Sequence, residues 1–227
     1  EGDVEETDFA SRSEAFSNLI KGVAHATVES VNVEGDVDVD GALLDAAVGN
    51  DGVLTVKKTL ENAVLSIREN VQIKSATVLH ASTPNSIFSG YVHNRSPHSV
   101  DVGTVAAVVE LTPTNDKSDT KDTQEIGKKL AMHVVASRPT YLSPDSVPVD
   151  VLEREKEILR EQIAASGKKS AKPEIIDKIV SGRMNKFYEE TCLTEQPHMV
   201  EESNPKISKF LDKLGLQVTR FQIASVV

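Results

Sequence analysis

Among the residues of this chain whose types and spacing could do chemistry, the first set is acidic. The segment Asp36-Val37-Asp38-Val39-Asp40-Gly41 resembles the first half of a calcium-binding EF-hand loop. Such a loop needs a bidentate carboxylate at its twelfth position, and Ala47 stands there. The segment therefore predicts a solvated acidic loop without calcium.

Cys192 follows an amphipathic stretch with no base beside it, which favours a buried apolar side chain over a nucleophile.

The histidines offer no second site. None stands at a metal-ligand spacing from another ligand on a predicted helix, and a single cysteine argues against zinc; they are His25, His80, His93, His98, His133 and His198. The chain has neither the Gly-x-x-x-x-Gly-Lys loop that cradles phosphates nor a dinucleotide-binding fingerprint. We therefore predict no metal, no cofactor and no enzymatic activity, and we expect any chemistry to belong to a partner.

Composition narrows the class of partner. The net charge is −10, which argues against binding DNA or RNA through a broad basic surface. No apolar run approaches the roughly 18 residues that a membrane-spanning helix needs, so we expect no membrane insertion. The first eight residues include five acids, the opposite charge to a leader peptide. With 39% hydrophobic residues but only 4% aromatic ones, the core must consist mainly of Val, Leu, Ile and Ala.

The pair Asp8-Phe9 could form a non-covalent contact, either within this chain or with another protein. Ser11 and Glu14 form a capping-box pair, which predicts that a helix begins at Ser11, immediately after Phe9 and Ala10. Phe9 lies outside the apolar stripe of that helix. It therefore serves either as a hydrophobic staple on its own helix, the commoner arrangement, or as a wedge inserted into another protein with Asp8 beside it.

The elements that must position these residues follow from periodicity. Helical spacing predicts helices over 11–29, 41–48, 56–69 and 125–137, while alternation predicts strands over 71–79, 87–93, 100–111 and 217–223. Two further amphipathic helices, over 149–165 and from Pro173 onward, predict an antiparallel coiled-coil hairpin. A short helix is expected over 205–214. The pattern indicates an α+β fold made of small antiparallel sheets with helices packed on them.

Six blocks occur in an order that carries a family resemblance: Glu6-Thr7-Asp8-Phe9, Ile67-Arg68-Glu69-Asn70, Gly90-Tyr91-Val92-His93, the stretch 130–139 (LAMHVVASRP), the stretch 178–188 (KIVSGRMNKFY) and Glu195-Gln196-Pro197. Together they resemble the family of translation elongation factor Ts, which exchanges guanine nucleotides on elongation factor Tu. The resemblance covers nearly the whole chain. The Ala131-Met132-His133-Val134 block and the Gly182-to-Phe187 block are specific. The Thr7-Asp8-Phe9 block would be weak alone, but six ordered blocks at compatible spacing are strong evidence of the resemblance.

The resemblance implies a fold and a site. The fold would be two α+β subdomains, over residues 1–90 and over 91–147 with 191–227, with the coiled-coil hairpin inserted at 148–190. Asp8 and Phe9 would enter the nucleotide-binding domain of elongation factor Tu and disturb its magnesium and phosphate region. Ile67, Arg68 and His93 would contact the same domain. The resemblance thus favours the wedge over the staple for Phe9.

The chain departs from the family at several points. Ala10 replaces the usual valine, Arg68 replaces a glycine, and the chain ends in Gln222 to Val227 where the family has an acidic, glycine-containing finish. The family's N-terminal ubiquitin-associated-like module of about fifty residues is absent from this sequence. These departures keep a second possibility open, a scaffold protein that retains the fold without exchange activity. They also favour a mitochondrial matrix protein over a bacterial cytoplasmic one.

Overall fold

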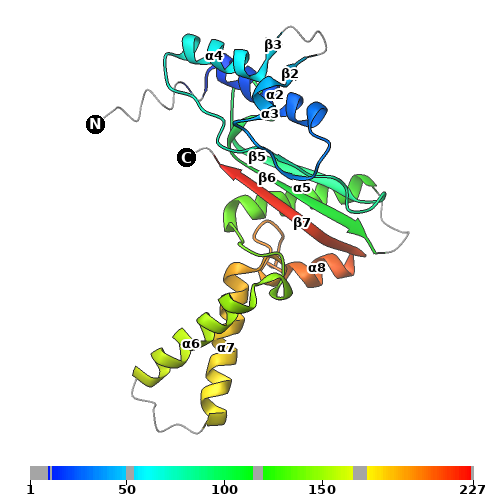
Figure 1. The fold of residues 1–227 in the computed structure, drawn as a ribbon. Coiled ribbons are helices and arrows are strands. Elements are labelled where there is room, and N and C mark those ends of the chain that lie inside the picture. Colours follow the sequence, from blue (N-terminus) through cyan, green and yellow to red (C-terminus); the bar gives the residue numbers. More distant parts are fainter. Residues whose placement is uncertain (1–9, 11, 50–53, 115–119, 166–172, 226–227) are drawn as a thin grey trace. The chain divides into compact units, whose positions relative to one another are not determined.

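A computed structural model of the chain describes residues 10, 12–49, 54–114, 120–165 and 173–225. The backbone divides into two compact units, which we describe separately. Unit 1 takes its residues from 1–81, 92–106 and 225–227, and unit 2 from 82–91 and 107–224. Helices and small sheets occur in both units, which confirms the α+β class (Figure 1).

Unit 1 is built around three helices: α2 (Glu14–Ser30), α3 (Ala42–Asp45) and α4 (Val56–Ile67). Two small antiparallel sheets accompany them, β1 (Gly35–Asp36) with β4 (Thr77–Val78) and β2 (Ala47–Val48) with β3 (Leu54–Thr55). The apolar residues buried between these elements are Leu19, Val23, Ala26, Leu43, Ala46, Val56 and Ala63. The expected helices over 11–29, 41–48 and 56–69 are thus present with shorter bounds.

The first helix begins later than the capping-box pair predicted. Its N-cap is Ser13, whose Oγ accepts a hydrogen bond from the backbone N–H of Phe16 at 3.2 Å. The Ser13 hydroxyl also donates to the carbonyl oxygen of Ala10 at 2.7 Å. Ser13 can therefore satisfy the first free N–H of the helix and hold the preceding turn together. The cap was predicted two residues earlier, at Ser11, which lies outside the described residues.

The strand predicted over 71–79 was also largely wrong. Only Thr77 and Val78 pair, with Asp36 and Gly35 of β1. The alternating apolar side chains before them, Val71 and Ile73, instead pack partly buried against the core of unit 1. Alternation here reflects one buried side of an extended segment, which does not require a neighbouring strand.

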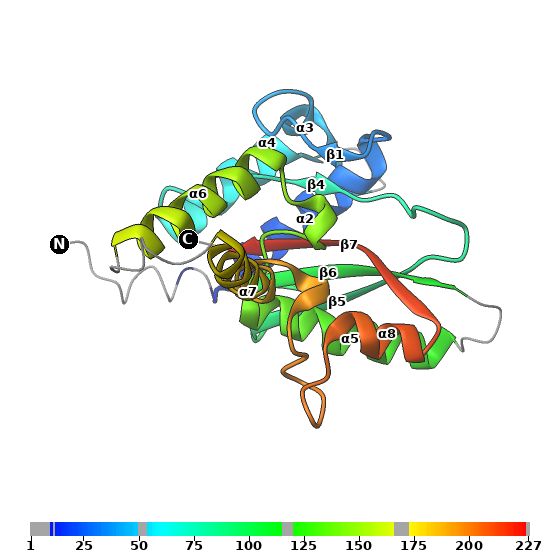
Figure 2. The same cartoon turned by 90° about the horizontal axis from the view of Figure 1, so that it is seen from below.

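A three-stranded sheet has the order β5 (Ile87–Arg95), β6 (Gly103–Pro113) and β7 (Leu216–Ser225). Its residues 87–91, 107–113 and 216–224 belong to unit 2, and the remaining strand ends belong to unit 1. Helices α5 (Thr120–Ser137) and α8 (Ile207–Lys213) cover one face of this sheet (Figure 2). Fully buried residues join sheet and helices; among them are Val109, Leu111, Leu130, Val134, Ile207, Leu211 and Leu216. The expected strands and both helices are confirmed, again with shifted ends.

Close packing of α5 on the sheet depends on Gly127. A Cβ atom added there would lie 2.4 Å from Ser89 Oγ and 3.3 Å from Leu111 Cδ1. The separation from Ser89 is far below van der Waals contact, so a Cβ at this position would push the helix and β5 apart.

Two longer helices of unit 2 are α6 (Val149–Ala165), which follows the short 3-10 helix η1 (Pro144–Ser146), and α7 (Pro173–Thr191), which precedes η3 (Leu193–Glu195). The helices share a cluster of buried side chains: Leu159, Ile163, Val180 and Met184. Arg183 Nη1 also donates to Gln162 Oε1 at 2.9 Å. The residues expected to join the helices lie outside the described ranges, so the coiled-coil hairpin and the three-part domain division remain predictions.

Candidate functional site

The predicted wedge residues, Asp8 and Phe9, lie outside the described residues. The next residue, Ala10, is buried. Its carbonyl oxygen accepts hydrogen bonds from both the backbone N–H and the hydroxyl of Ser13, at 3.1 and 2.7 Å. Ala10 stands where the resembling family has valine, and it is a buried anchor four positions before Glu14, the first residue of α2.

Ile67 is the last residue of α4 and is half-buried. Its side chain packs against the core of unit 1. Part of its surface is therefore committed to the fold of unit 1, and only the remainder is open to another protein.

Arg68 caps the C-terminus of α4 in the left-handed conformation, with φ 63° and ψ 23°. Its backbone N–H donates to the carbonyl oxygen of Val64 at 2.8 Å, which closes the last turn, and its side chain is exposed. Glycine is preferred at this position of a helix because a Cβ atom is strained there. The backbone geometry thus explains why the resembling family has glycine here.

This conformation makes a testable prediction for stability. Arg68→Gly should raise the free energy of unfolding by about 1 kcal/mol, since the left-handed conformation costs a residue with a Cβ roughly that much. Urea denaturation at 25 °C measures the change. Arg68→Ala is the matched control because it removes the guanidinium and keeps the Cβ. An equal gain in both variants would assign the effect to charge and contradict the backbone explanation.

His93 lies near the end of β5 in a tightly built stretch of backbone. Its side chain is exposed. Asn94, the next residue, has a φ of 47°, which Asn tolerates better than most side chains. A Cβ atom on Gly103 would lie 2.4 Å from the carbonyl oxygen of His93. Ile67, Arg68 and His93 all belong to unit 1. Arg68 and Asn94, the residue after His93, both have a positive φ.

Two buried histidines in unit 2 were not singled out by the sequence. His133 of α5 lies 2.8 Å through Nε2 from Gln196 Oε1, and Gln196 Nε2 donates to the carbonyl oxygen of Glu190. The amide oxygen is therefore the acceptor, and His133 Nε2 carries the proton. His133 Nδ1 accepts from the backbone N–H of Met199 at 3.3 Å. Both nitrogens are thus used by the neutral ring, and the sequence blocks 130–139 and 195–197 meet at this contact.

His198 completes the cluster. Its ring centroid lies 5.4 Å from that of His133 and 5.5 Å from that of Phe210, both with edge-to-face geometry. Burial lowers the pKa of His133, although its hydrogen bond to Gln196 opposes the shift. Burial, together with the neighbouring His133, lowers the pKa of His198 to about 4. The pair is therefore neutral at pH 7 and packs as part of the core.

The histidine cluster predicts acid sensitivity. The pKa of His198 is lower in the folded chain than its ordinary value of 6.5. Neutral His198 therefore contributes its full stabilisation of the fold above pH 6.5, and this stabilisation is lost as the pH falls toward 4. From His198 alone, the free energy of unfolding should fall by about 2 kcal/mol between pH 7 and pH 5. Urea denaturation of the unmodified chain and of His198→Phe, which cannot be protonated, checks this.

His198→Phe should reduce the difference between the two pH values. The control, His25→Asn, removes an exposed histidine that pairs with Glu29 and should retain most of that difference. An unaltered pH dependence in His198→Phe would show that other groups cause the acid loss.

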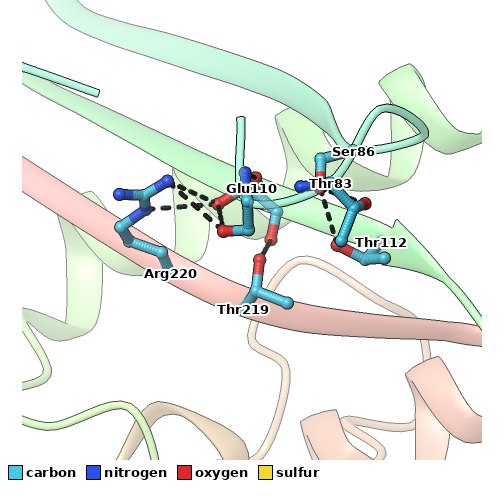
Figure 3. Close-up of polar contacts among 7 residues, drawn as sticks. Thr83, Ser86, Glu110, Thr112, Thr219 and Arg220 are labelled. Atoms are coloured by element: carbon cyan, nitrogen blue, oxygen red, sulfur yellow. Dashed lines mark hydrogen bonds and ion pairs between the residues drawn. The ribbon is translucent and has the colours of Figure 1, made fainter. Parts of the chain in front are cut away.

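Glu110 forms a second buried polar network in unit 2 (Figure 3). Its carboxylate accepts from Ser82 N and Oγ at 2.6 and 2.7 Å. It also accepts from Arg220 Nη2 at 2.9 Å, a contact that Figure 3 shows. Burial disfavours ionisation of the carboxyl, but the hydrogen bonds from Ser82 outweigh it and hold the pKa of Glu110 below its ordinary value. The network ties β6, β7 and the segment before β5 together, which is a structural role.

The chemistry available to the described residues is limited. Within 10, 12–49, 54–114, 120–165 and 173–225, no group of three or more His, Cys, Asp or Glu is placed to hold a metal ion. A hollow along α6 is lined by alternating charges, among them Glu153, Lys156, Glu157 and Arg160. Burial raises the pKa of the Cys192 thiol, which leaves it a poor nucleophile. In the same part of the chain, no helix combines the length and apolar character that a membrane crossing requires.

Comparison with known proteins gives a consistent result. A family model described as "Elongation factor TS" matches residues 6–226. Elongation factor Ts of Paramagnetospirillum magneticum is 34% identical over 213 residues, which is 94% of this chain and 62% of the relative. That of Rhodospirillum rubrum is 33% identical over 210 residues, or 92% of this chain and 62% of the relative.

A mitochondrial relative is similar to the same degree. Elongation factor Ts, mitochondrial, of Ostreococcus tauri is 35% identical over 212 residues, which is 87% of this chain and 59% of the relative. The chain therefore spans about three fifths of the length of these curated relatives, 62% of the first two and 59% of the third.

Proposed function

The chain belongs to the elongation factor Ts family, and from this premise we propose that it is a translation factor that promotes release of GDP from elongation factor Tu. The observation that carries the proposal is the family match over residues 6–226. That range includes every predicted contact residue: Asp8, Phe9, Ile67, Arg68 and His93. Ala10, the described residue that follows Asp8 and Phe9 in the sequence, is buried.

In the proposed mechanism, the Phe9 ring enters the nucleotide-binding domain of elongation factor Tu and disturbs the region that holds magnesium and phosphate. Asp8 meets a polar or charged group beside it. Ile67, Arg68 and His93 of unit 1 contact the same domain. Unit 2 binds another domain of the partner, and α6 and α7 make a separate, more peripheral contact.

The driving force is thermodynamic coupling between two ligands of one protein. If the bound factor weakens GDP binding, bound GDP weakens factor binding by the same ratio. A distortion that costs bound GDP about 4 kcal/mol lowers its affinity roughly a thousandfold. Faster release requires only that the factor bind the distorted state more tightly than the undistorted one. The proposal therefore assigns no catalytic group to this chain.

We place the protein in the mitochondrial matrix, with the bacterial cytoplasm as the alternative. Relatives of comparable identity come from both settings, one of them mitochondrial. Localisation of a tagged chain in cells of its source organism distinguishes them.

Binding measured with and without GDP tests the proposed coupling. Calorimetric titration into nucleotide-free elongation factor Tu should give tight binding, and saturating GDP should weaken it by at least about a hundredfold, or roughly 3 kcal/mol. Binding that GDP leaves unchanged would favour the scaffold alternative, in which the fold is kept without exchange activity. Absence of binding in both conditions would exclude elongation factor Tu as the partner.

A further inference from the structure

Two serine hydroxyls meet in the interior of unit 1. Ser17 Oγ of α2 and Ser96 Oγ, which follows β5, lie 2.6 Å apart although 79 residues separate them in the sequence. Ser17 is fully buried and Ser96 nearly so. A neutral hydrogen bond contributes only about 1 kcal/mol to stability, and apolar side chains of the same shape often replace both partners with little loss. The directional contact is therefore better understood as fixing one segment against another.

Ser96 organises the turn that follows β5. Its backbone N–H donates to the carbonyl oxygen of Val102 at 2.8 Å, and its Oγ accepts from the backbone N–H of His98 at 3.2 Å. The hydroxyl hydrogen then remains available to donate to Ser17. Ser96 stands three residues after His93 in the same segment of unit 1, so its position is linked closely to that of His93.

Ser17 lies at the other end of the link, one turn after the N-cap of α2. Its backbone N–H donates to the carbonyl oxygen of Ser13 at 3.1 Å, and Ser13 in turn binds the carbonyl oxygen of Ala10. A continuous set of hydrogen bonds thus runs from Ala10 through Ser13 and Ser17 to Ser96. Every residue in it belongs to unit 1.

We propose that Ser17 and Ser96 are positioning residues for nucleotide exchange. Their hydrogen bond sets the first turn of α2, which begins at Glu14, five positions after Phe9 in the sequence, relative to the end of β5 that carries His93. The inference rests on the proposed function. Two groups that must contact one partner domain together have to be held at a fixed spacing, and a displacement of about 1 Å can cost up to about a hundredfold in rate.

The test measures the rate of labelled GDP release from elongation factor Tu at saturating factor. Ser17→Ala and Ser96→Ala should each slow release by at least about fivefold, and the double variant should be no slower than the slower single variant, because both act through one contact. Thr27→Val is the matched control. Its hydroxyl is also buried on α2 but donates to the carbonyl oxygen of Val23 in the same helix, at 2.7 Å. Release with this variant should stay within about twofold of the unmodified chain.

Thermal unfolding of each variant establishes that it is folded at the assay temperature, which separates lost positioning from lost structure. An equal slowing by Thr27→Val, additive effects in the double variant, or unchanged release with both serine variants would overturn the inference while leaving the proposed function intact. Failure of the unmodified chain to stimulate release would overturn both.

Discussion

Phe9→Ala is expected to slow factor-stimulated GDP release by at least about tenfold, equivalent to about 1.4 kcal/mol of lost coupling. The truncation removes the ring proposed to enter the nucleotide-binding domain, while the buried anchor at Ala10 and the Ser13 cap are retained. Stopped-flow fluorescence of labelled GDP bound to elongation factor Tu measures the rate at saturating factor.

The staple and wedge alternatives for Phe9 predict opposite pairs of results. If the ring is a wedge, Phe9→Ala slows release and leaves the free energy of unfolding nearly unchanged. If it is a staple on α2, the same substitution lowers stability and affects release little at temperatures where the chain is folded. Phe9→Leu, which retains most of the apolar volume, should retain more stimulation than Phe9→Ala. Release by Phe9→Ala at the unmodified rate would remove Phe9 from the mechanism.

Arg220→Met is expected to lower the free energy of unfolding of unit 2 by about 3–5 kcal/mol, because it leaves a buried carboxylate without its cation. The Glu110 side chain is completely buried, and Arg220 approaches its Oε2 with Nη2 at 2.9 Å and Nε at 3.2 Å. Ser82 would remain as a hydrogen-bond donor to a charge that water cannot reach. Urea denaturation followed by circular dichroism measures the loss.

Two further variants test whether the expected loss comes from leaving a buried charge unpaired, and not from breaking any ion pair. Glu110→Gln combined with Arg220→Met removes the uncompensated charge and should recover part of the loss, since an amide can still bond with Ser82. Lys58→Met breaks an exposed pair with Glu61, 3.1 Å apart, and should cost less than about 1 kcal/mol. A similarly small cost for Arg220→Met would show that Glu110 does not need its partner in the folded state.

The sequence predicted best the elements in which the apolar pattern repeats over many residues. The expected arm at 149–165 coincides with α6, and Pro173 begins α7 as anticipated from its preference for the first helical turn. The start of α2 was misplaced because Ser11 and Ser13 are equally good capping residues by type. Only the geometry of the Ser13 hydroxyl, bonded to Phe16 N–H and Ala10 O, distinguishes them.

The short strands and the buried polar contacts could not be predicted from local pattern. Val71 and Ile73 alternate like strand residues but satisfy their burial against helices. His133 meets Gln196 across 63 residues and Glu110 meets Arg220 across 110, so no spacing rule connects them. The family resemblance supplied the predicted contact residues, because exposed side chains such as Arg68 and His93 carry no periodic signal that marks them for a partner.

The backbone gives a physical consequence of one departure from the family, the replacement of glycine by Arg68. The left-handed conformation of Arg68 is one that glycine adopts without strain. In this chain Arg68 adopts that conformation at some cost in stability, and it presents a cation where the resembling family has a glycine. Whether that cation aids binding is answered by the release rate of Arg68→Gly beside that of Arg68→Ala.

The most direct test of the central claim is the rate at which labelled GDP leaves elongation factor Tu of the same organism as the full chain is titrated in. If the chain is an exchange factor, the rate rises with its concentration to a plateau at least about a hundredfold above the spontaneous rate, a difference of roughly 3 kcal/mol in the barrier to release. A rate that stays at the spontaneous value, at chain concentrations where binding is complete, would contradict exchange and leave a binding or scaffold role.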